Sequence, residues 1–301
     1  METKKVYLQT DIGGDIDDFW ALVMLLKQPW LDLRMILTDT GNTVYRAAIC
    51  AKLLQLAGRG DVVVGAGLAE WPDARHPMSH LDWVKDYPLA SYPNYTQNGI
   101  DRFVDMVRAE DGPVTLVAIG PVPSLAAALR KAPDIARKID FVGMFGSVYR
   151  GYSGHPRPDA EYNVYMYVED SKAVFSADWR SATITPLDTC GLVKLEGDLY
   201  GRIAASADPL VAAIRDVYHG WCRHHAGGKP VPAPTASSVL FDTVAVHLAS
   251  SWDFLVREDI RLAVDDKGFT RPDPAGKPFH VAVDWLDLPA YQTFLVDTLC
   301  H

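Results

Sequence analysis

The chain has 301 residues, of which 49% are hydrophobic and 22% are charged, and its formal net charge is -9. This length allows one large domain or two small ones with a sizeable core. The negative charge, with no basic cluster in the sequence, argues against a nucleic acid or an anionic membrane as partner. No apolar run approaches the length of a membrane span, no signal peptide follows Met1, and the four cysteines show no CxxC spacing, so we expect a cytoplasmic protein.

Strand-like and helix-like segments alternate along the chain from residue 5 onward. Strands are predicted over 5–11, 31–39, 61–66 and 114–120, and helices over 17–28, 44–58 and 122–133. Segments 102–112, 138–146, 171–179 and 182–188 continue the alternation. Gly58 ends the second helix, where a residue that tolerates positive φ is favoured. The pattern predicts an α/β fold, Rossmann-like, with a mostly parallel central sheet flanked by helices.

Two long segments interrupt this alternation, at residues 68–99 and 223–237. Both are rich in Pro, His and aromatic residues, and connections of this length in a compact domain usually form a lid or a binding loop. Neither segment has the composition of a linker. We therefore expect a single domain over 1–301 with active-site loops near 68–99 and 223–237.

Four aspartates follow the first predicted strand, at Asp11, Asp15, Asp17 and Asp18. Ligands of open α/β sheets bind outside the carboxyl ends of the strands, which is where these side chains are expected. Crowded carboxylates raise one another's pKa unless a cation lies among them. Oxygen donors without a Cys or a pair of His favour a hard cation, Ca²⁺ with Mg²⁺ as the alternative.

Two other interpretations of the aspartates remain open. In the first, Asp17 or Asp18 only caps the next helix, as aspartate often does. In the second, Asp15 and Asp17 form the DxD motif of a phosphatase with an aspartyl nucleophile. The motif lies several residues beyond the strand end, however, and Gln9 stands where a strand-end pair would begin.

Five segments of the chain resemble, in order, the motifs of the inosine-uridine nucleoside hydrolase family. Residues 9–18, QTDIGGDIDD, are similar to the family's DxDIGxDxDD opening, with Gln9 in place of its first Asp. The other four segments are 41–58 with Asn42, 112–129 with Ile119, 160–164 with Glu161 and Asn163, and 241–246 with Asp242. Together they cover most of the chain from residue 6 to about 250.

The resemblance implies the nucleoside hydrolase fold and a role for each matched residue. It implies a metal held by Asp11, Asp18, Asp242 and the carbonyl of Ile119, and ribose hydroxyls bound by Asp17, Glu161 and Asn163. The chemistry is consistent with these residue types, because a hard cation lowers the pKa of bound water and a carboxylate such as Asp11 can take the proton. The water then attacks an anomeric carbon with oxocarbenium character.

Asn42 belongs to the expected catalytic residues, since its amide can donate to or accept from the sugar. The alternative is an ordinary turn or cap residue, which is common for Asn after Gly. Asp242 and Glu161 have similar alternatives, as a helix cap and as a surface charge.

The chain departs from the family pattern around the leaving group. Phe241 occupies the position of a His that protonates the leaving base in purine-cleaving members, and phenylalanine has no proton to give. We assign this role to His225, with His224, His76 and His80 as alternatives. His155 stands where the family has an Asn that reaches the sugar, so His155 and Phe241 are expected at the substrate.

The sequence therefore predicts an enzyme that hydrolyses the N-glycosidic bond of a ribonucleoside or a related N-ribosyl compound in a metal-dependent reaction, giving ribose and free base. A metal-dependent ribosyl-binding protein without turnover is the alternative from a different class, motivated by Phe241 and Gln9. The aspartyl phosphatase ranks last because it leaves Asn163 and Asp242 without a role. The family resemblance also implies a homodimer or homotetramer.

Overall fold

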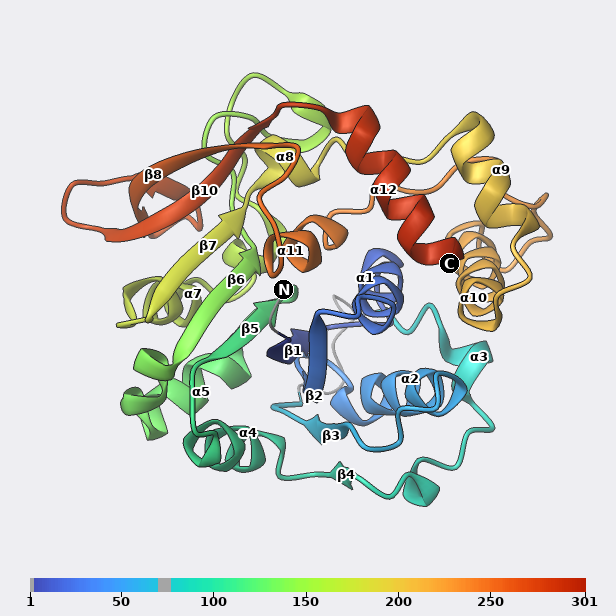
Figure 1. The fold of residues 1–301 in the computed structure, drawn as a ribbon, viewed down its shortest axis with the longest axis horizontal. Coiled ribbons are helices and arrows are strands. Elements are labelled where there is room, and N and C mark those ends of the chain that lie inside the picture. Colours follow the sequence, from blue (N-terminus) through green and yellow to red (C-terminus); the bar gives the residue numbers. More distant parts are fainter. Residues whose placement is uncertain (1–2, 70–76) are drawn as a thin grey trace.

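The computed structural model describes residues 3–69 and 77–301, and within them a ten-stranded sheet forms the centre of the molecule (Figure 1). The strand order is β4-β3-β2-β1-β5-β6-β7-β10-β8-β9. The strands are β1 Lys4–Thr10, β2 Leu31–Thr38, β3 Val63–Ala66, β4 Tyr95–Thr96, β5 Val114–Ala118, β6 Ile139–Met144, β7 Ser181–Thr185, β8 Leu255–Val264, β9 Thr270–Pro272 and β10 Lys277–Trp285. Neighbouring strands are parallel from β4 to β10, and only the pairs β10–β8 and β8–β9 are antiparallel. The predicted mostly parallel sheet is confirmed.

Helices cover both faces of the sheet, with a hydrophobic core on each side. They are α1 Asp17–Leu26, α2 Thr43–Leu56, α3 Leu81–Val84, α4 Gly99–Ala109, α5 Pro123–Lys131, α6 Tyr162–Tyr165, α7 Val168–Ser176, α8 Leu187–Cys190, α9 Gly197–Ala205, α10 Pro209–His225, α11 Thr243–Leu248 and α12 Leu288–Cys300. Val6 and Leu8 of β1 join the core under α1 and α2, whereas Tyr7 joins the core under α4 and α5. This alternation follows from the two-residue period of a strand.

Helix α1 is apolar on all sides and lies inside the molecule. Of its ten residues, all but Leu26 are buried, and it packs against β2, α10, α11 and α12. A helix that is hydrophobic all round is a buried helix. Its first two residues, Asp17 and Asp18, are therefore carried into the interior, which explains why an apolar segment runs straight into a group of carboxylates.

The predicted segments agree closely with the observed elements. The predicted strand 31–39 corresponds to β2, and the predicted helix 44–58 corresponds to α2 and ends at Gly58, whose φ is +69°. Three differences follow from tertiary structure. Helix α10 continues to His225, so the predicted loop 223–237 begins in a helical turn; segment 68–99 contains α3 and β4; and strands β8 to β10 were not predicted.

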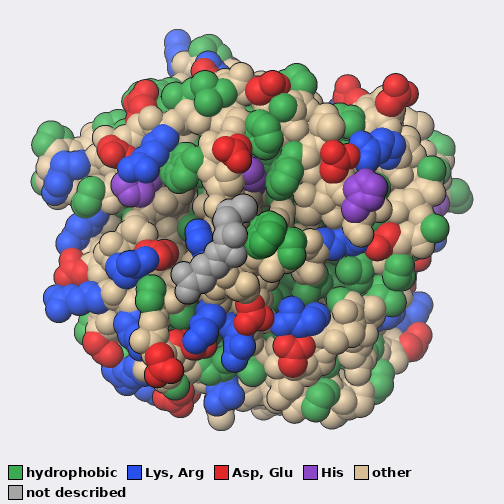
Figure 2. Space-filling view, viewed as in Figure 1, with side chains coloured by type: hydrophobic (Ala, Val, Ile, Leu, Met, Phe, Trp, Pro, Cys, Tyr) green, Lys and Arg blue, Asp and Glu red, His purple; other side chains and the backbone are tan. Residues whose placement is uncertain are grey.

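The surface carries side chains of both charges. On the face shown in Figure 2, Lys and Arg side chains alternate with Asp and Glu, without a continuous basic patch among the described side chains. No helix in the described ranges has the length and apolar character needed to cross a membrane. His76, one of the candidate proton donors, lies outside the described residues.

Candidate active site

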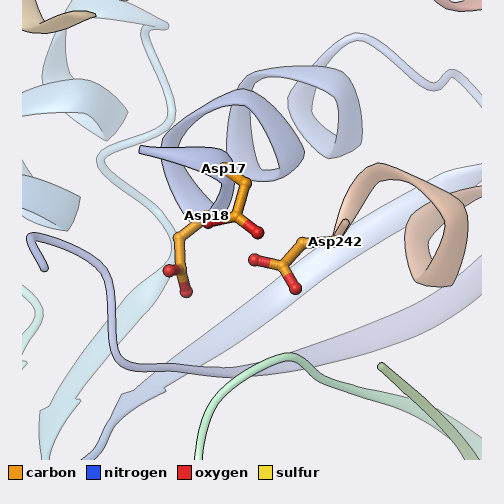
Figure 3. Close-up of side chains that lie close together, drawn as sticks. All are labelled: Asp17, Asp18 and Asp242. Atoms are coloured by element: carbon orange, nitrogen blue, oxygen red, sulfur yellow. The ribbon is translucent and has the colours of Figure 1, made fainter. Parts of the chain in front are cut away.

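Three carboxylates meet where β1 leads into α1. Asp17 and Asp18 begin α1, Asp242 directly precedes α11, and one oxygen of each lies within 4.8 Å of the other two (Figure 3). Neither α1 nor α11 has a side-chain capping hydrogen bond at its start. The three aspartates therefore do not serve as helix caps, and their side chains are directed at one another instead.

The environment of this carboxylate cluster suits a cation. Asp17, Asp18 and Asp242 are only 6%, 4% and 2% exposed. Burial, together with the charges of neighbouring aspartates, raises the pKa of each well above its usual range, although Thr10 donates a hydrogen bond to Asp18. Within the described residues, none of the three forms an ion pair with Lys, Arg or His. A buried, oxygen-only donor set without a positive partner fits Ca²⁺ or Mg²⁺.

The cluster forms part of the wall of a cavity of about 380 Å³. The cavity is lined by Asp11, Gly14, Asp15, Asp17, Asp18, Arg46, Pro77, Ile119, Met144, Tyr152, Glu161, Tyr162, Asn163, His225, Phe241 and Asp242. Many of these residues follow the carboxyl ends of the central strands, whereas Arg46 lies in α2, His225 ends α10, and Phe241 and Asp242 precede α11. A cavity of this size is typical of a small-molecule site.

Asp11 lies at the end of β1, between a glycine and an arginine. A Cβ atom on Gly120 would lie 2.6 Å from Asp11 Oδ1, so only glycine leaves room for this side chain. On its other side, Asp11 Oδ2 faces Arg46 Nη2 at 3.9 Å. Burial raises the pKa of Asp11, and the charge of Arg46 opposes that rise. No oxygen of Asp11 joins the three-carboxylate cluster, which differs from the metal set implied by the family resemblance.

Glu161 and Asn163 line the same cavity in fixed orientations. Glu161 Oε2 accepts a hydrogen bond from Gly146 N at 2.9 Å, and its Oε1 accepts one from Asn163 N at 2.7 Å. Burial raises the pKa of Glu161 to about 7. Asn163 Nδ2 donates to the carbonyl oxygens of Ile119, at 3.3 Å, and Met144, at 3.1 Å. The Ile119 carbonyl therefore lies at the cavity, and one of its two lone pairs is already in use.

Among the described residues, the lining of the cavity also includes aromatic groups and one histidine. The rings of Tyr152 and Phe241 pack edge to face, with centroids 6.2 Å apart. His225 Nδ1 lies 2.9 Å from the carbonyl oxygen of Trp221. Because a carbonyl only accepts, Nδ1 carries a hydrogen and Nε2 is the nitrogen left for a substrate.

Two expected site residues do not line this cavity. Asn42 caps α2, and its Oδ1 accepts a hydrogen bond from Tyr45 N at 2.9 Å. His155 is exposed at the end of the turn that carries Tyr152. The structure thus favours the cap interpretation for Asn42, and it places His155 on the surface rather than at the sugar.

Among the histidine candidates, His225 alone of those described lines the cavity. His224 is exposed, and His80 is buried with its pKa lowered to about 3 by burial. The remaining expected residues, Asp11, Asp17, Asp18, Ile119, Glu161, Asn163, Phe241 and Asp242, all line it.

Among the residues that sequence reasoning missed are Arg46 and Tyr152, which line the cavity, and Gly120, which lies against Asp11. Arg46 stands inside the apolar run YRAAIC of a predicted helix, and a lone charge at such a position was the available signal. Gly120 is the last residue of the predicted strand 114–120, a position where close backbone approach calls for glycine. Tyr152 lies in an irregular loop, and no local pattern marked it.

A family model described as inosine-uridine preferring nucleoside hydrolase matches residues 6–289. The chain belongs to this family. It is accordingly a nucleoside hydrolase, an enzyme that hydrolyses the N-glycosidic bond of a ribonucleoside or related N-ribosyl compound. This result leaves the aspartyl phosphatase interpretation without support.

Relatives of this nucleoside hydrolase extend over most or all of its length. The pyrimidine-specific ribonucleoside hydrolase RihA of Shewanella sp. (strain ANA-3) is 24% identical over 99% of this chain and 96% of its own. The pyrimidine-specific ribonucleoside hydrolase RihB of Escherichia coli (strain SE11) is 30% identical over 72% of this chain and 70% of its own.

Solved structures agree in fold. An inosine-guanosine nucleoside hydrolase superposes with a TM-score of 0.78 and 18% identity, covering 98% of both chains. A plant nucleoside hydrolase superposes with a TM-score of 0.77 and 22% identity, covering 99% of both chains. The predicted nucleoside hydrolase fold is confirmed.

Proposed function

We propose that this nucleoside hydrolase binds the ribosyl group over its carboxylates and cleaves the bond to the base with water. The observation that carries the proposal is the meeting of Asp17, Asp18 and Asp242 in one cavity with Asp11 and Glu161. Residues this far apart in sequence share a cavity only because the fold brings the start of α1 and the start of α11 together.

We propose Ca²⁺, with Mg²⁺ as the alternative, as the ion of the site. Asp18 and Asp242 would hold it, with Asp11 and the Ile119 carbonyl as the further ligands at the same wall. When bound, such a cation makes water more acidic and can orient vicinal hydroxyls. Asp17, the third member of the cluster, is proposed to accept hydrogen bonds from the ribose hydroxyls.

Asp11 is the proposed base. It takes a proton from the attacking water while the water oxygen forms a bond to the anomeric carbon and the carbon–nitrogen bond breaks. Glu161 and Asn163 hold the ribose, and their hydrogen bonds to the backbone and to each other fix their positions before the substrate arrives.

His225 is the proposed proton donor to the leaving base. Protonated His225 gives the hydrogen on Nε2 to the leaving nitrogen and keeps the hydrogen on Nδ1, which the Trp221 carbonyl accepts. Phe241 and Tyr152 provide ring surfaces against which a base can pack. These two rings supply contact area, and His225 supplies the proton that Phe241 lacks.

The test is a reducing-sugar assay over uridine, cytidine, inosine, guanosine and nitrophenyl riboside, with and without Ca²⁺ or Mg²⁺. Uridine and cytidine come first because two relatives are named pyrimidine-specific. We expect ribose release that EDTA abolishes and added cation restores. Calorimetric binding of ribose without release from any of these compounds would instead favour the ribosyl-binding protein.

His225→Ala tests the leaving-group assignment. We expect turnover of natural nucleosides to fall by about 100-fold and turnover of nitrophenyl riboside, whose leaving group needs no proton, to change less than about threefold. His224→Ala is the matched control, since its exposed ring is adjacent in sequence and does not line the cavity. Equal losses on both substrates would mean that another group is the acid.

We also propose that the enzyme is cytoplasmic, binds no nucleic acid and forms a homodimer or homotetramer. All four cysteines are free, which agrees with a reducing compartment, and the net charge of -9 disfavours nucleic acid. The assembly is proposed from the family resemblance. Light scattering of the purified protein measures it directly.

A further inference from the structure

Among the described residues, the wall of the cavity contains six carboxylates and one guanidinium. That guanidinium belongs to Arg46, which is only 2% exposed although it carries a permanent charge. The family motifs matched above assign it no role. Burying a charge to this degree costs free energy of folding unless the charged group is hydrogen-bonded and paired with an opposite charge. The partners of Arg46 therefore indicate its role.

Two backbone carbonyls fix the arginine. Arg46 Nε donates to Thr40 O at 2.9 Å, and Nη1 donates to Ile12 O at 2.8 Å. Thr40 has a φ of +61°, in the left-handed region that threonine rarely adopts. Backbone strain at Thr40 indicates that the surrounding structure holds its carbonyl in the position where it accepts the hydrogen bond from Arg46. Nη2 is the end of the fork that remains, and it faces Asp11 Oδ2 at 3.9 Å.

Asp11 is thereby placed between two rigid groups. Gly120 lies against its Oδ1 and the guanidinium lies against its Oδ2. In this position it remains outside the cluster of Asp17, Asp18 and Asp242, although it lines the same cavity. A cation at the cluster and the guanidinium therefore compete for the same carboxylate.

We infer that Arg46 is a positioning residue that draws Asp11 toward itself, which weakens the contact of Asp11 with a cation at the cluster, keeps Asp11 available as the base and lowers the affinity of the site for a divalent cation. The inference rests on the proposed role of Asp11 for its effect on turnover. Its effect on cation affinity is independent of that role. Without the guanidinium, one fixed positive charge leaves the cavity and Asp11 is free to turn toward the cation.

The test compares Arg46→Gln, Arg46→Lys and the wild type in two measurements, Ca²⁺ binding by calorimetry and steady-state kinetics. Gln removes the charge, whereas Lys keeps it as a single ammonium group, which cannot reproduce the planar fork that binds both carbonyls and faces Asp11. We expect Arg46→Gln to bind Ca²⁺ about tenfold more tightly and Arg46→Lys to bind it within about threefold of the wild type. In both variants we expect kcat to fall more than about tenfold, with KM changed less than about threefold.

Arg215→Gln is the matched control. Arg215 Nη1 also donates to two backbone carbonyls, those of Ile203 at 2.9 Å and Ser206 at 2.7 Å, but it does not line the cavity. Loss of such a structural bridge should lower thermal stability and leave Ca²⁺ affinity and kcat unchanged.

Opposite changes in cation affinity and kcat in Arg46→Gln support the inference, because a purely structural role would lower both. Unchanged or weaker Ca²⁺ binding in a folded Arg46→Gln protein overturns it. If Arg46→Gln does not fold, wild-type kcat in Arg46→Lys overturns it and a selective loss of kcat supports it. A wild-type protein without activity on any ribosyl compound would refute the proposed function, while the Ca²⁺ arm would still decide the effect of Arg46 on the cation.

Discussion

At the scale of single residues, the site depends on charges that repel one another. Asp17, Asp18 and Asp242 are buried side by side, so each destabilises the ionised form of the others. This arrangement lowers the stability of the protein without a cation and increases the affinity for one. The three negative charges therefore favour cation binding and disfavour the folded state in the absence of a cation.

Asp242→Asn should change the stability without a cation and the affinity for a cation in opposite directions. Removing one of the repelling charges should raise the midpoint of thermal unfolding in EDTA by a few degrees, whereas Ca²⁺ affinity should fall about 100-fold with the loss of a charged ligand. Scanning fluorimetry with a Ca²⁺ titration measures both. Asp198→Asn, at an exposed position of α9, is the control. A variant that is less stable in EDTA and binds Ca²⁺ normally would contradict the assignment.

At the scale of elements, the site requires the segment that follows β5 to approach the end of β1 very closely. A Cβ on Gly120 would lie 2.6 Å from Asp11 Oδ1 and 2.7 Å from Asp11 N, so Gly120→Ala must move one of the two segments. We expect kcat to fall at least about tenfold. Gly112→Ala, at the other end of β5, has nothing within 4 Å of the added methyl group and should retain wild-type kinetics. Equal kinetics in the two variants would show that the approach is unimportant.

A second contact between elements ties β2 to the start of α5 and predicts a pH dependence. Asp39 accepts hydrogen bonds from Ser124 N at 3.0 Å and Ser124 Oγ at 2.6 Å, yet burial raises its pKa to about 7. The folded protein therefore keeps a proton on Asp39 that the unfolded chain releases above its ordinary pKa of 3.8. The resulting stabilisation is complete below that value and is lost as the pH rises through 7.

Asp39→Asn removes this titration. Between pH 4 and pH 8, the unfolding free energy of the wild type should therefore fall by about 2–4 kcal/mol relative to that of the variant. Urea unfolding at a series of pH values measures it, with Asp86→Asn, at an exposed position, as the control. A difference that stays constant with pH would show that Asp39 is ionised throughout.

At the scale of the whole molecule, the carboxylate cluster joins distant parts of the chain. A cation that binds the folded state only should stabilise it by about 3 kcal/mol at a concentration of 100 times its Kd. Because its proposed ligands lie at the starts of both α1 and α11, Ca²⁺ should slow amide hydrogen exchange in both helices. Helix α4, on the other face of the sheet, serves as the internal reference. Protection of only one of the two helices would mean that the cation does not bridge them.

The sequence by itself determined the alternating strands and helices as far as β7, but not strands β8 to β10. Alternating apolar segments predict a parallel sheet, and the aspartates after β1 mark its carboxyl end, because strand and helix periodicity and the residues at element ends are local properties. Most of the site residues followed from their motifs. The family resemblance also implied that Asp242 meets Asp18. Only the tertiary structure placed Asp17 in the same cluster and Asp11 outside it, decided for the cap at Asn42, and directed Arg46 into the cavity. Those outcomes depend on how α1, α2 and α11 pack, and packing between distant segments is not encoded in any local pattern of residues.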